Sequence, residues 1–274
     1  MDLTSTARLN NGVEIPWLGL GVYKAAAGME TRNAVRWAIE AGYRHVDTAA
    51  FYANEAGVAE GISDSGVNPG EIFVTTKLWN DDHGYDRALA AFDRSRKLLQ
   101  RDVVDLYLIH WPIKDIFLET WRALEKLYAD GLVRAIGVSN FLIPQLEQLM
   151  DNSEVPPAVN QVEWHPRVLQ RPLLEFCKEH AVQFQAWSPL GRATYLDDPT
   201  ISQIASRHAR SPAQVLIRWG LEHAVVTIPK SVHQQRIIAN SQVFDFRLSP
   251  QEVTALDALD RNQRLGPHPD QIGG

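Results

Sequence analysis

The sequence predicts a (β/α)8 barrel, and three observations support this fold class. Short apolar runs alternate with amphipathic stretches along most of the chain, which is typical of parallel βαβ units. Eight such units follow one another, and eight close more naturally into a barrel than into an open sheet. The chain has 274 residues, of which 45% are hydrophobic, and barrels of this length commonly form one domain. We therefore expect residues 1–274 to fold as a single domain.

The first element is expected to be a β-hairpin that precedes the barrel. Residues 7–15 alternate in polarity around the pair Asn11-Gly12. An Asn-Gly pair between alternating residues is a strong signal for a tight hairpin turn. The repeating pattern of apolar runs and helical stretches begins only after this hairpin.

The barrel strands are expected at eight short apolar runs, and stretches with helical periodicity separate them. The strand candidates are residues 18–21, 43–47, 72–77, 104–110, 133–138, 158–161, 183–187 and 225–228. The helical stretches are residues 30–41, 54–63, 85–99, 117–130, 143–150, 171–179 and 212–223. Residues 234–241 are expected to form the helix that follows the last strand.

Capping residues mark several helix ends. Gly42 and Gly131 stand just past the ends of two predicted helices, where glycine is favoured. Ser211 and Ser249 each precede a proline, and a serine N-cap followed by proline is a helix-start signal.

Three segments fall outside the eight regular units. The start signal at Ser249 predicts an extra helix over residues 251–259. Residues 199–209 predict a second extra helix, between the seventh strand and its regular helix. Residues 261–274 contain two prolines and three glycines, so we expect an irregular segment on the surface.

Composition argues against several classes of function. The formal net charge is −6, so the chain lacks the basic surface expected of a protein that binds nucleic acid or an anionic membrane. No apolar run is long enough to span a bilayer, and the first residues lack the pattern of a signal peptide. Cys177 is the only cysteine, so no internal disulfide can form, and no Cys/His cluster indicates a metal site. We expect a cytoplasmic monomer without a metal.

Four polar residues stand at or just after the ends of three successive strands. Asp47 ends one run and Tyr52 follows it in the loop, while Lys77 and His110 end the next two runs. The carboxyl ends of barrel strands form the working face, so these side chains should converge there. Further polar or aromatic residues at strand ends are Tyr23, Ser139, Asn140, Gln161, Trp187, Ser188, Lys230 and Ser231.

Each of the four residues also has a purely structural explanation. Asp47 and Lys77 could form a buried ion pair, and His110 could be a hydrogen-bonded core histidine. Tyr52 alone could be a packing residue. Four such residues at three successive strand ends are difficult to explain as independent packing choices, so their coincidence favours a catalytic site.

Several motifs make the chain resemble the aldo-keto reductase family over nearly its full length. They are residues 44–49 with Tyr52 and Asn54-Glu55, then 75–80, 105–112, 136–141 and 228–231. Within the family the chain is most similar to the bacterial 2,5-diketo-D-gluconate reductases, through residues 187–191, 243–246 and 268–270.

The resemblance implies reduction of aldehyde or ketone carbonyls, with diketones or keto-sugars as candidate substrates, by NADPH. Tyr52 would be the general acid, and Lys77 would lower the pKa of its phenol. Asp47 would hold Lys77 in place. His110 would donate a hydrogen bond to the carbonyl oxygen.

The resemblance also implies which residues bind cofactor and substrate. Those expected at the cofactor are Gly21, Val22, Tyr23, Asp47, Ser139, Asn140, Gln161, Trp187, Ser188, Leu190, Gly191, Lys230, Ser231, Val232, Arg236 and Asn240. Trp187 would stack on the nicotinamide, and Lys230, Ser231 and Arg236 would clamp the 2′-phosphate. Those expected at the substrate are Tyr23, Tyr52, Trp79, His110, Trp111 and His268.

Two other functions remain open at this point. In a metal-dependent barrel hydrolase, His110, Glu163 and His165 could supply ligands together with Asp47, although Lys77 would place a positive charge beside the metal. A non-catalytic redox sensor could bind NADPH on the same barrel and report to a partner. Sensitivity to chelators tests the first alternative, and a turnover assay tests the second.

Overall fold

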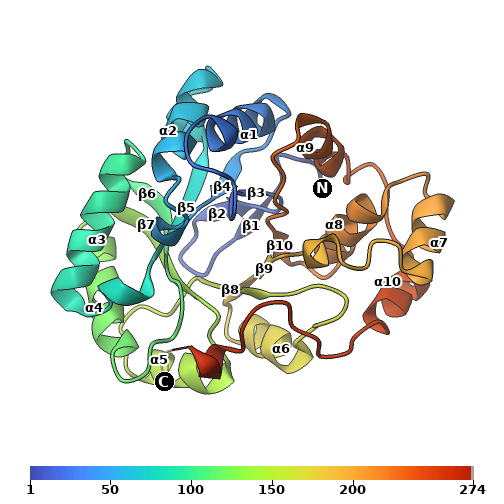
Figure 1. Cartoon of the computed structure of the whole chain (residues 1–274). Helices are drawn as coiled ribbons and strands as arrows, with labels where there is room; N and C mark the ends of the chain where they lie inside the picture. Colours follow the sequence, from blue (N-terminus) through green and yellow to red (C-terminus); the bar gives the residue numbers. More distant parts are fainter. Residues whose placement is uncertain (273–274) are drawn as a thin grey trace.

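The computed structural model describes residues 1–272 and shows a ring of parallel strands surrounded by helices (Figure 1). The strands follow one another around the sheet in chain order, from β3 to β10. They are β3 (Leu20–Gly21), β4 (His45–Asp47), β5 (Phe73–Leu78), β6 (Val104–Ile109), β7 (Val133–Ser139), β8 (Val159–Glu163), β9 (Gln183–Trp187) and β10 (Val226–Thr227). The predicted (β/α)8 barrel is confirmed.

Single backbone bridges close the ring between β3 and β10. Leu18 pairs with Thr227 and Gly21 pairs with Lys230, both in the parallel sense. Gly21 is required at this closure, because a Cβ atom there would lie 2.7 Å from the carbonyl oxygen of Ile228. Both closing strands are shorter than the predicted 18–21 and 225–228, because their outer residues pair only through isolated bridges.

The helices occupy the outer layer in the predicted order (Figure 1). The regular ones are α1 (Met29–Glu40), α2 (Glu55–Asp64), α3 (Tyr85–Leu98), α4 (Phe117–Ala129), α5 (Ile143–Asp151), α6 (Arg171–Glu179), α8 (Pro212–Glu222) and α9 (Gln234–Ser241). The two extra helices are α7 (Pro199–Arg207) and α10 (Pro250–Asp257). Within residues 1–272 no helix is long and apolar enough to cross a membrane.

The capping signals act as the sequence predicts. The hydroxyls of Ser211 and Ser249 accept hydrogen bonds from the backbone N–H groups three residues on, and each serine completes a capping box. Gly42 and Gly131 have φ angles of 101° and 71°, which only glycine adopts without strain. These local signals explain why the helix ends were predicted to within about two residues.

The N-terminal hairpin closes the bottom of the barrel. Strands β1 (Thr6–Arg8) and β2 (Glu14–Pro16) pair antiparallel, and Gly12 occupies the turn with a φ of 86°. Apolar hairpin residues share one buried cluster with inward-facing strand residues, including Ile15 with Leu106 and Leu108. The opposite, carboxyl-terminal end of the barrel is therefore the end available for a site.

The C-terminal segment crosses from α10 past α6 to α5 (Figure 1). The backbone N–H groups of Arg261 and Gln263 donate to the carbonyl oxygen of Arg167, and Gln145 Nε2 donates to Asp270 Oδ1 at 3.2 Å. The segment is irregular as predicted, apart from a single 3-10 turn, η5 (Pro269–Gln271). Residues 273 and 274 of the predicted segment lie outside the described residues.

Candidate active site

A buried ion pair forms the centre of the site. Lys77 is fully buried, and its ammonium donates to Asp47 Oδ1 at 2.6 Å and to the carbonyl oxygen of Thr48 at 2.8 Å. Its third contact is the phenol oxygen of Tyr52, 3.4 Å away. The neighbouring strands β4 and β5 supply the pair, so the predicted convergence of Asp47, Lys77 and Tyr52 is observed.

A buried asparagine positions the loop that carries Tyr52. Tyr52 ends a 3-10 turn, η1 (Ala50–Tyr52), that follows β4. Asn54 is 1% exposed; it accepts from the Thr48 hydroxyl at 2.8 Å and donates to the carbonyl oxygen of Val22 at 3.0 Å. This bridge ties the loop after β4 to the loop after β3, where the Tyr23 ring lies 5.0 Å from the Tyr52 ring, centroid to centroid.

His110 follows β6 and faces the same pocket. Its ring centroid lies 5.7 Å from that of Tyr52 and 5.2 Å from that of Trp79. Burial, and then the charge of Lys77, hold the pKa of His110 well below its ordinary value. The imidazole is therefore neutral around neutral pH and carries a single N–H.

Burial also shifts the pKa values of Asp47 and Lys77. It raises the pKa of Asp47 and lowers that of Lys77, while the attraction between their charges opposes both shifts. The contact of 2.6 Å, with further acceptors for the ammonium, favours the charged pair.

The expectation that the pKa of Tyr52 lies below its ordinary value is wrong for this structure. Burial, followed by the charge of Asp47 and the neighbouring Tyr23, raises the pKa of Tyr52 well above its ordinary value. Burial and the charge of Asp47 outweigh the lysine charge, so the net pKa is raised although the ammonium by itself favours the phenolate. The phenol is therefore protonated at neutral pH, which is the form that a proton donor needs.

A polar row continues from Asp47 across the barrel to β7 and β8. Gln161 Nε2 donates to Asp47 Oδ2 at 2.7 Å, and the Ser139 hydroxyl donates to the carbonyl oxygen of Gln161 at 2.7 Å. Asn140 Nδ2 in turn donates to the Ser139 hydroxyl at 3.1 Å. The sequence predicted Gln161 at the end of its strand. In the structure β8 continues to Glu163, so Gln161 lies within the strand instead.

Trp187 and Asn140 join this row to His110. Trp187 Nε1 donates to Asn140 Oδ1 at 2.8 Å, and Asn140 Nδ2 donates to the backbone carbonyl of His110 at 3.0 Å. Asn140 has a φ of 64°, a left-handed conformation that asparagine tolerates better than most residues. The turn after β7 is thus bent so that the amide bridges Trp187 and His110.

The residues predicted at the cofactor lie almost entirely on one continuous arc of the ring. Because β10 closes onto β3, the arc runs β7, β8, β9, β10, β3, while β4, β5 and β6 carry the catalytic candidates. The arc and α9 hold Ser139, Asn140, Gln161, Trp187, Ser188, Leu190, Gly191, Lys230, Ser231, Val232, Arg236, Asn240, Gly21, Val22 and Tyr23.

The backbone and the charges along this arc suit a ligand that carries phosphate groups. Gly191 has a φ of 55°, and a Cβ atom there would overlap the ring of Tyr195, so a bare backbone is required after β9. Lys230 and Arg236 are both exposed, the first after β10 and the second in the first turn of α9. A helix N-terminus with two nearby cations is suited to a phosphate group.

Aromatic rings form the rim of the pocket, and one of them was missed. Tyr23 is 40% exposed, Trp79 is half-buried, and Trp111 is 8% exposed. Phe51, 49% exposed, stacks on Trp79 with ring centroids 3.8 Å apart. Its position directly before Tyr52 in the sequence was the available signal for its role.

His268 remains a prediction for the substrate site. Its ring Nδ1 accepts a hydrogen bond from the backbone N–H of Asp270 at 3.3 Å. That contact caps the turn η5, which docks on α5. Of the other predicted substrate residues, Tyr52, Trp79 and Trp111 lie around the His110 ring, and Tyr23 lies against Tyr52.

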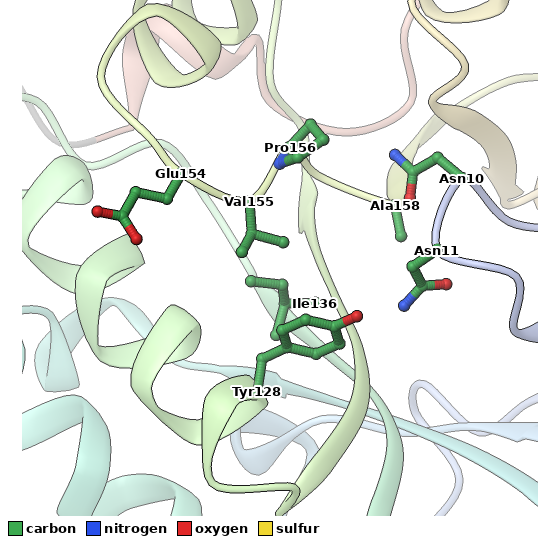
Figure 2. Close-up of a pocket in the computed structure, with 8 residues that line it drawn as sticks. All are labelled: Asn10, Asn11, Tyr128, Ile136, Glu154, Val155, Pro156 and Ala158. Carbon is green, nitrogen blue, oxygen red and sulfur yellow. The ribbon is translucent and has the colours of Figure 1, made fainter.

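A surface cavity of about 280 Å³ lies away from this chemistry (Figure 2). Its walls combine the hairpin turn, α4 and the segment that leads into β8; the lining residues are Asn10, Asn11, Tyr128, Ile136, Glu154, Val155, Pro156 and Ala158. Asn10 and Asn11 donate to the carbonyl oxygens of Pro157 and Arg134, which fastens the hairpin there. The cavity is at the amino-terminal end of the barrel, so it is not the reaction pocket.

Glu163 and His165 were considered as metal ligands from the sequence. Both are fully buried, and His165 Nε2 lies 3.2 Å from Glu163 Oε1. The same carboxylate accepts the backbone N–H groups of Leu265 and Gly266. In the part of the chain that the structure describes, no group of three His, Cys, Asp or Glu residues is arranged to bind a metal.

The mouth of the parallel eight-stranded barrel joins a buried Asp–Lys pair, a protonated tyrosine and a neutral histidine. This arrangement is suited to an oxidoreductase that acts on carbonyl groups. The sequence model described as "Aldo/keto reductase family" matches residues 18–261. The chain belongs to the aldo/keto reductase family, as its motifs indicated.

Individual relatives agree over nearly the whole chain. The glyoxal reductase of Bacillus subtilis (strain 168) is 53% identical over 271 residues, which cover 99% of this chain and 98% of that protein. A solved aldo-keto reductase from a Medee basin deep-sea metagenome library has a TM-score of 0.95 and 42% identity, covering 97% of this chain and 99% of its own. The Bombyx mori aldo-keto reductase, solved in complex with NADP, has a TM-score of 0.92 and 38% identity, covering 98% and 97%.

Proposed function

We propose that this chain reduces aldehyde and ketone carbonyls to alcohols with NADPH, and that Asp47, Tyr52, Lys77 and His110 perform the reaction. The observation that carries the proposal is the geometry at Lys77, whose ammonium lies 2.6 Å from Asp47 Oδ1 and 3.4 Å from the Tyr52 oxygen. A buried cation beside a protonated phenol is suited to proton donation and to stabilising the phenolate that remains.

Each residue has a separate role at the carbonyl. Bound NADPH supplies the hydride for the carbonyl carbon, so negative charge develops on the oxygen. Tyr52 donates its proton to that oxygen, and Lys77 stabilises the resulting tyrosinate. Asp47 fixes Lys77 and keeps it charged. The neutral His110 ring donates its N–H to the same oxygen and orients the carbonyl.

The aromatic rim favours small vicinal dicarbonyls as substrates. The stacked rings of Phe51 and Trp79 stand beside His110 and narrow the approach to it. The relative from Bacillus subtilis is named a glyoxal reductase. We expect NADPH oxidation to give a higher kcat/KM with glyoxal and methylglyoxal than with a keto-sugar. A higher value for the keto-sugar, measured in the same panel, would reject this substrate class.

The cofactor choice depends on Arg236. A charge-assisted hydrogen bond contributes roughly 1.5–3 kcal/mol, which is about tenfold or more in affinity. Arg236→Ala should therefore raise the Kd for NADPH about tenfold and change the Kd for NADH less than about twofold. Paired titrations of each cofactor at two ionic strengths test this, and the salt dependence of NADPH binding should be weaker in the variant.

A matched control separates the phosphate contact from the general effect of removing a surface cation. Arg247 is an exposed arginine in the loop after α9, outside the predicted cofactor arc. Arg247→Ala should leave both dissociation constants unchanged. Equal losses for NADPH and NADH in Arg236→Ala would show that Arg236 does not contact the 2′-phosphate.

We also propose that the chain acts as a single-domain monomer in the cytoplasm. The one cysteine, Cys177, is buried and reduced, as expected for a protein that folds without disulfides. Size-exclusion chromatography with light scattering tests the monomer, and a fluorescent fusion tests the location.

A further inference from the structure

Glu163 holds the C-terminal segment by its backbone. The carboxylate ends strand β8 and is fully buried. Its Oε1 accepts the backbone N–H of Leu265 at 2.6 Å, and its Oε2 accepts that of Gly266 at 3.2 Å. His165 Nε2 lies 3.2 Å from Oε1 on the other side. Two amides from a segment about a hundred residues later in the chain therefore converge on one buried carboxylate.

Gly266 also lies against Trp187. A Cβ atom at Gly266 would lie 2.5 Å from the Cη2 atom of the Trp187 ring, so the backbone of the segment packs directly on the indole edge. Along the same edge of the ring, Trp187 Nε1 donates to Asn140, whose amide holds the carbonyl oxygen of His110. The contact sequence therefore runs from Glu163 through Gly266 and Trp187 to the wall of the reaction pocket.

The protonation of Glu163 supports a charged contact. Burial alone would raise the pKa of this carboxyl, but hydrogen bonds from His165, Leu265 and Gly266 hold it below its ordinary value. Hydrogen bonds from N–H groups to a carboxylate are stronger than those to a neutral acceptor. The segment is also held by the exposed Arg261, Gln263 and Asp270, for which water competes. The half-buried Arg264 is a further anchor, and its guanidinium donates to Gln170 Oε1 at 2.6 Å.

We propose that Glu163 is a positioning residue for carbonyl reduction. By binding the amides of Leu265 and Gly266, it fixes the C-terminal segment on Trp187 and thereby holds that wall of the pocket in place. The proposal rests on the proposed function, because it concerns the pocket in which that carbonyl reduction would take place. Glu163 touches neither substrate nor cofactor, since its side chain is fully buried beneath the segment.

Three variants and one control test this role. Glu163→Ala removes both acceptors, whereas Glu163→Gln keeps an amide oxygen that can accept one of the two bonds. Gly266→Ala leaves the carboxylate intact and displaces the segment from the indole, because its new Cβ atom collides with the ring. Glu175→Ala is the control, since Glu175 is an exposed carboxylate on the neighbouring helix α6.

Two readouts are needed, and one of them is independent of activity. Backbone hydrogen exchange over residues 261–272 should accelerate about tenfold or more in Glu163→Ala, as expected for loss of charge-assisted hydrogen bonds. The KM for the carbonyl should rise by a similar factor, about tenfold, while kcat changes less than about threefold because strands β4 to β6 are untouched. Glu163→Gln should restore much of both, Gly266→Ala should raise KM, and Glu175→Ala should match the parent.

The outcomes separate this proposal from the proposed function. Unchanged exchange in Glu163→Ala would overturn the clamp, and faster exchange with an unchanged KM would overturn its positioning role. If Glu163→Ala does not fold, Gly266→Ala decides instead, and an unchanged KM in that variant would overturn the positioning role. Absence of turnover in the parent would instead reject the proposed function, with hydrogen exchange still reporting on the clamp.

Discussion

Replacing Tyr52 with phenylalanine should lower the rate of carbonyl reduction by at least about a hundredfold, since general acid catalysis contributes roughly 10²–10⁴. The substitution removes only the hydroxyl, so the ring retains its contact with Tyr23. The Asp47–Lys77 pair keeps its own contact of 2.6 Å. Circular dichroism and NADPH affinity should therefore match the parent, while single-turnover reduction of a dicarbonyl slows.

The pH profile gives a second test of the same role. The pKa of Tyr52 lies well above its ordinary value, so the phenol remains the proton-carrying form throughout the neutral range. Reduction by the parent should therefore be insensitive to pH there and decline only in strongly alkaline solution. Tyr128→Phe, which removes a phenol hydroxyl beside the cavity at the opposite end of the barrel, is the matched control. Full activity in Tyr52→Phe would assign the acid to another group.

The fold could be predicted from the sequence because its signals are local. Alternating apolar runs gave the strand order, and Ser211 and Ser249 gave helix starts through contacts within four residues. The ends of β3 and β10 were predicted less well. Their pairing depends on Gly21 approaching Ile228 across the closure of the barrel, a contact between residues about two hundred positions apart.

The candidate site was predictable to the extent that it lies at strand ends. Asp47, Lys77 and His110 follow from the period of the barrel, since the carboxyl ends of neighbouring strands meet at one face. The roles of Phe51 and Glu163 did not follow, because each depends on a partner distant in sequence. Phe51 stacks on Trp79, and Glu163 binds the amides of the C-terminal segment.

The direction of the Tyr52 pKa was also beyond the sequence. A lysine beside a phenol lowers the pKa of the phenol if the lysine charge acts alone. In the structure, the carboxylate of Asp47 lies 2.6 Å from that ammonium, and burial disfavours the phenolate further. The sign of the shift depends on this three-dimensional balance, which residue spacing does not encode.

Lys77→Met should strongly slow carbonyl reduction and destabilise the fold. The substitution leaves Asp47, 2% exposed, without its cation, and removing one partner of a buried ion pair costs roughly 3–5 kcal/mol. Tyr52 would also lose the charge that stabilises its conjugate base, so turnover should fall at least about a hundredfold. Urea unfolding followed by circular dichroism measures the first effect, and NADPH oxidation measures the second.

Two further variants separate catalysis from stability at this position. Lys97→Met removes an exposed lysine on α3, 69% exposed, and should change the free energy of unfolding by less than about 0.5 kcal/mol. The double variant Asp47→Asn with Lys77→Met removes the unpaired carboxylate and should recover part of the lost stability, because no isolated charge remains buried. It should recover no activity, since the cation beside Tyr52 is still missing. A folded Lys77→Met protein with parental turnover would show that the ion pair is structural only.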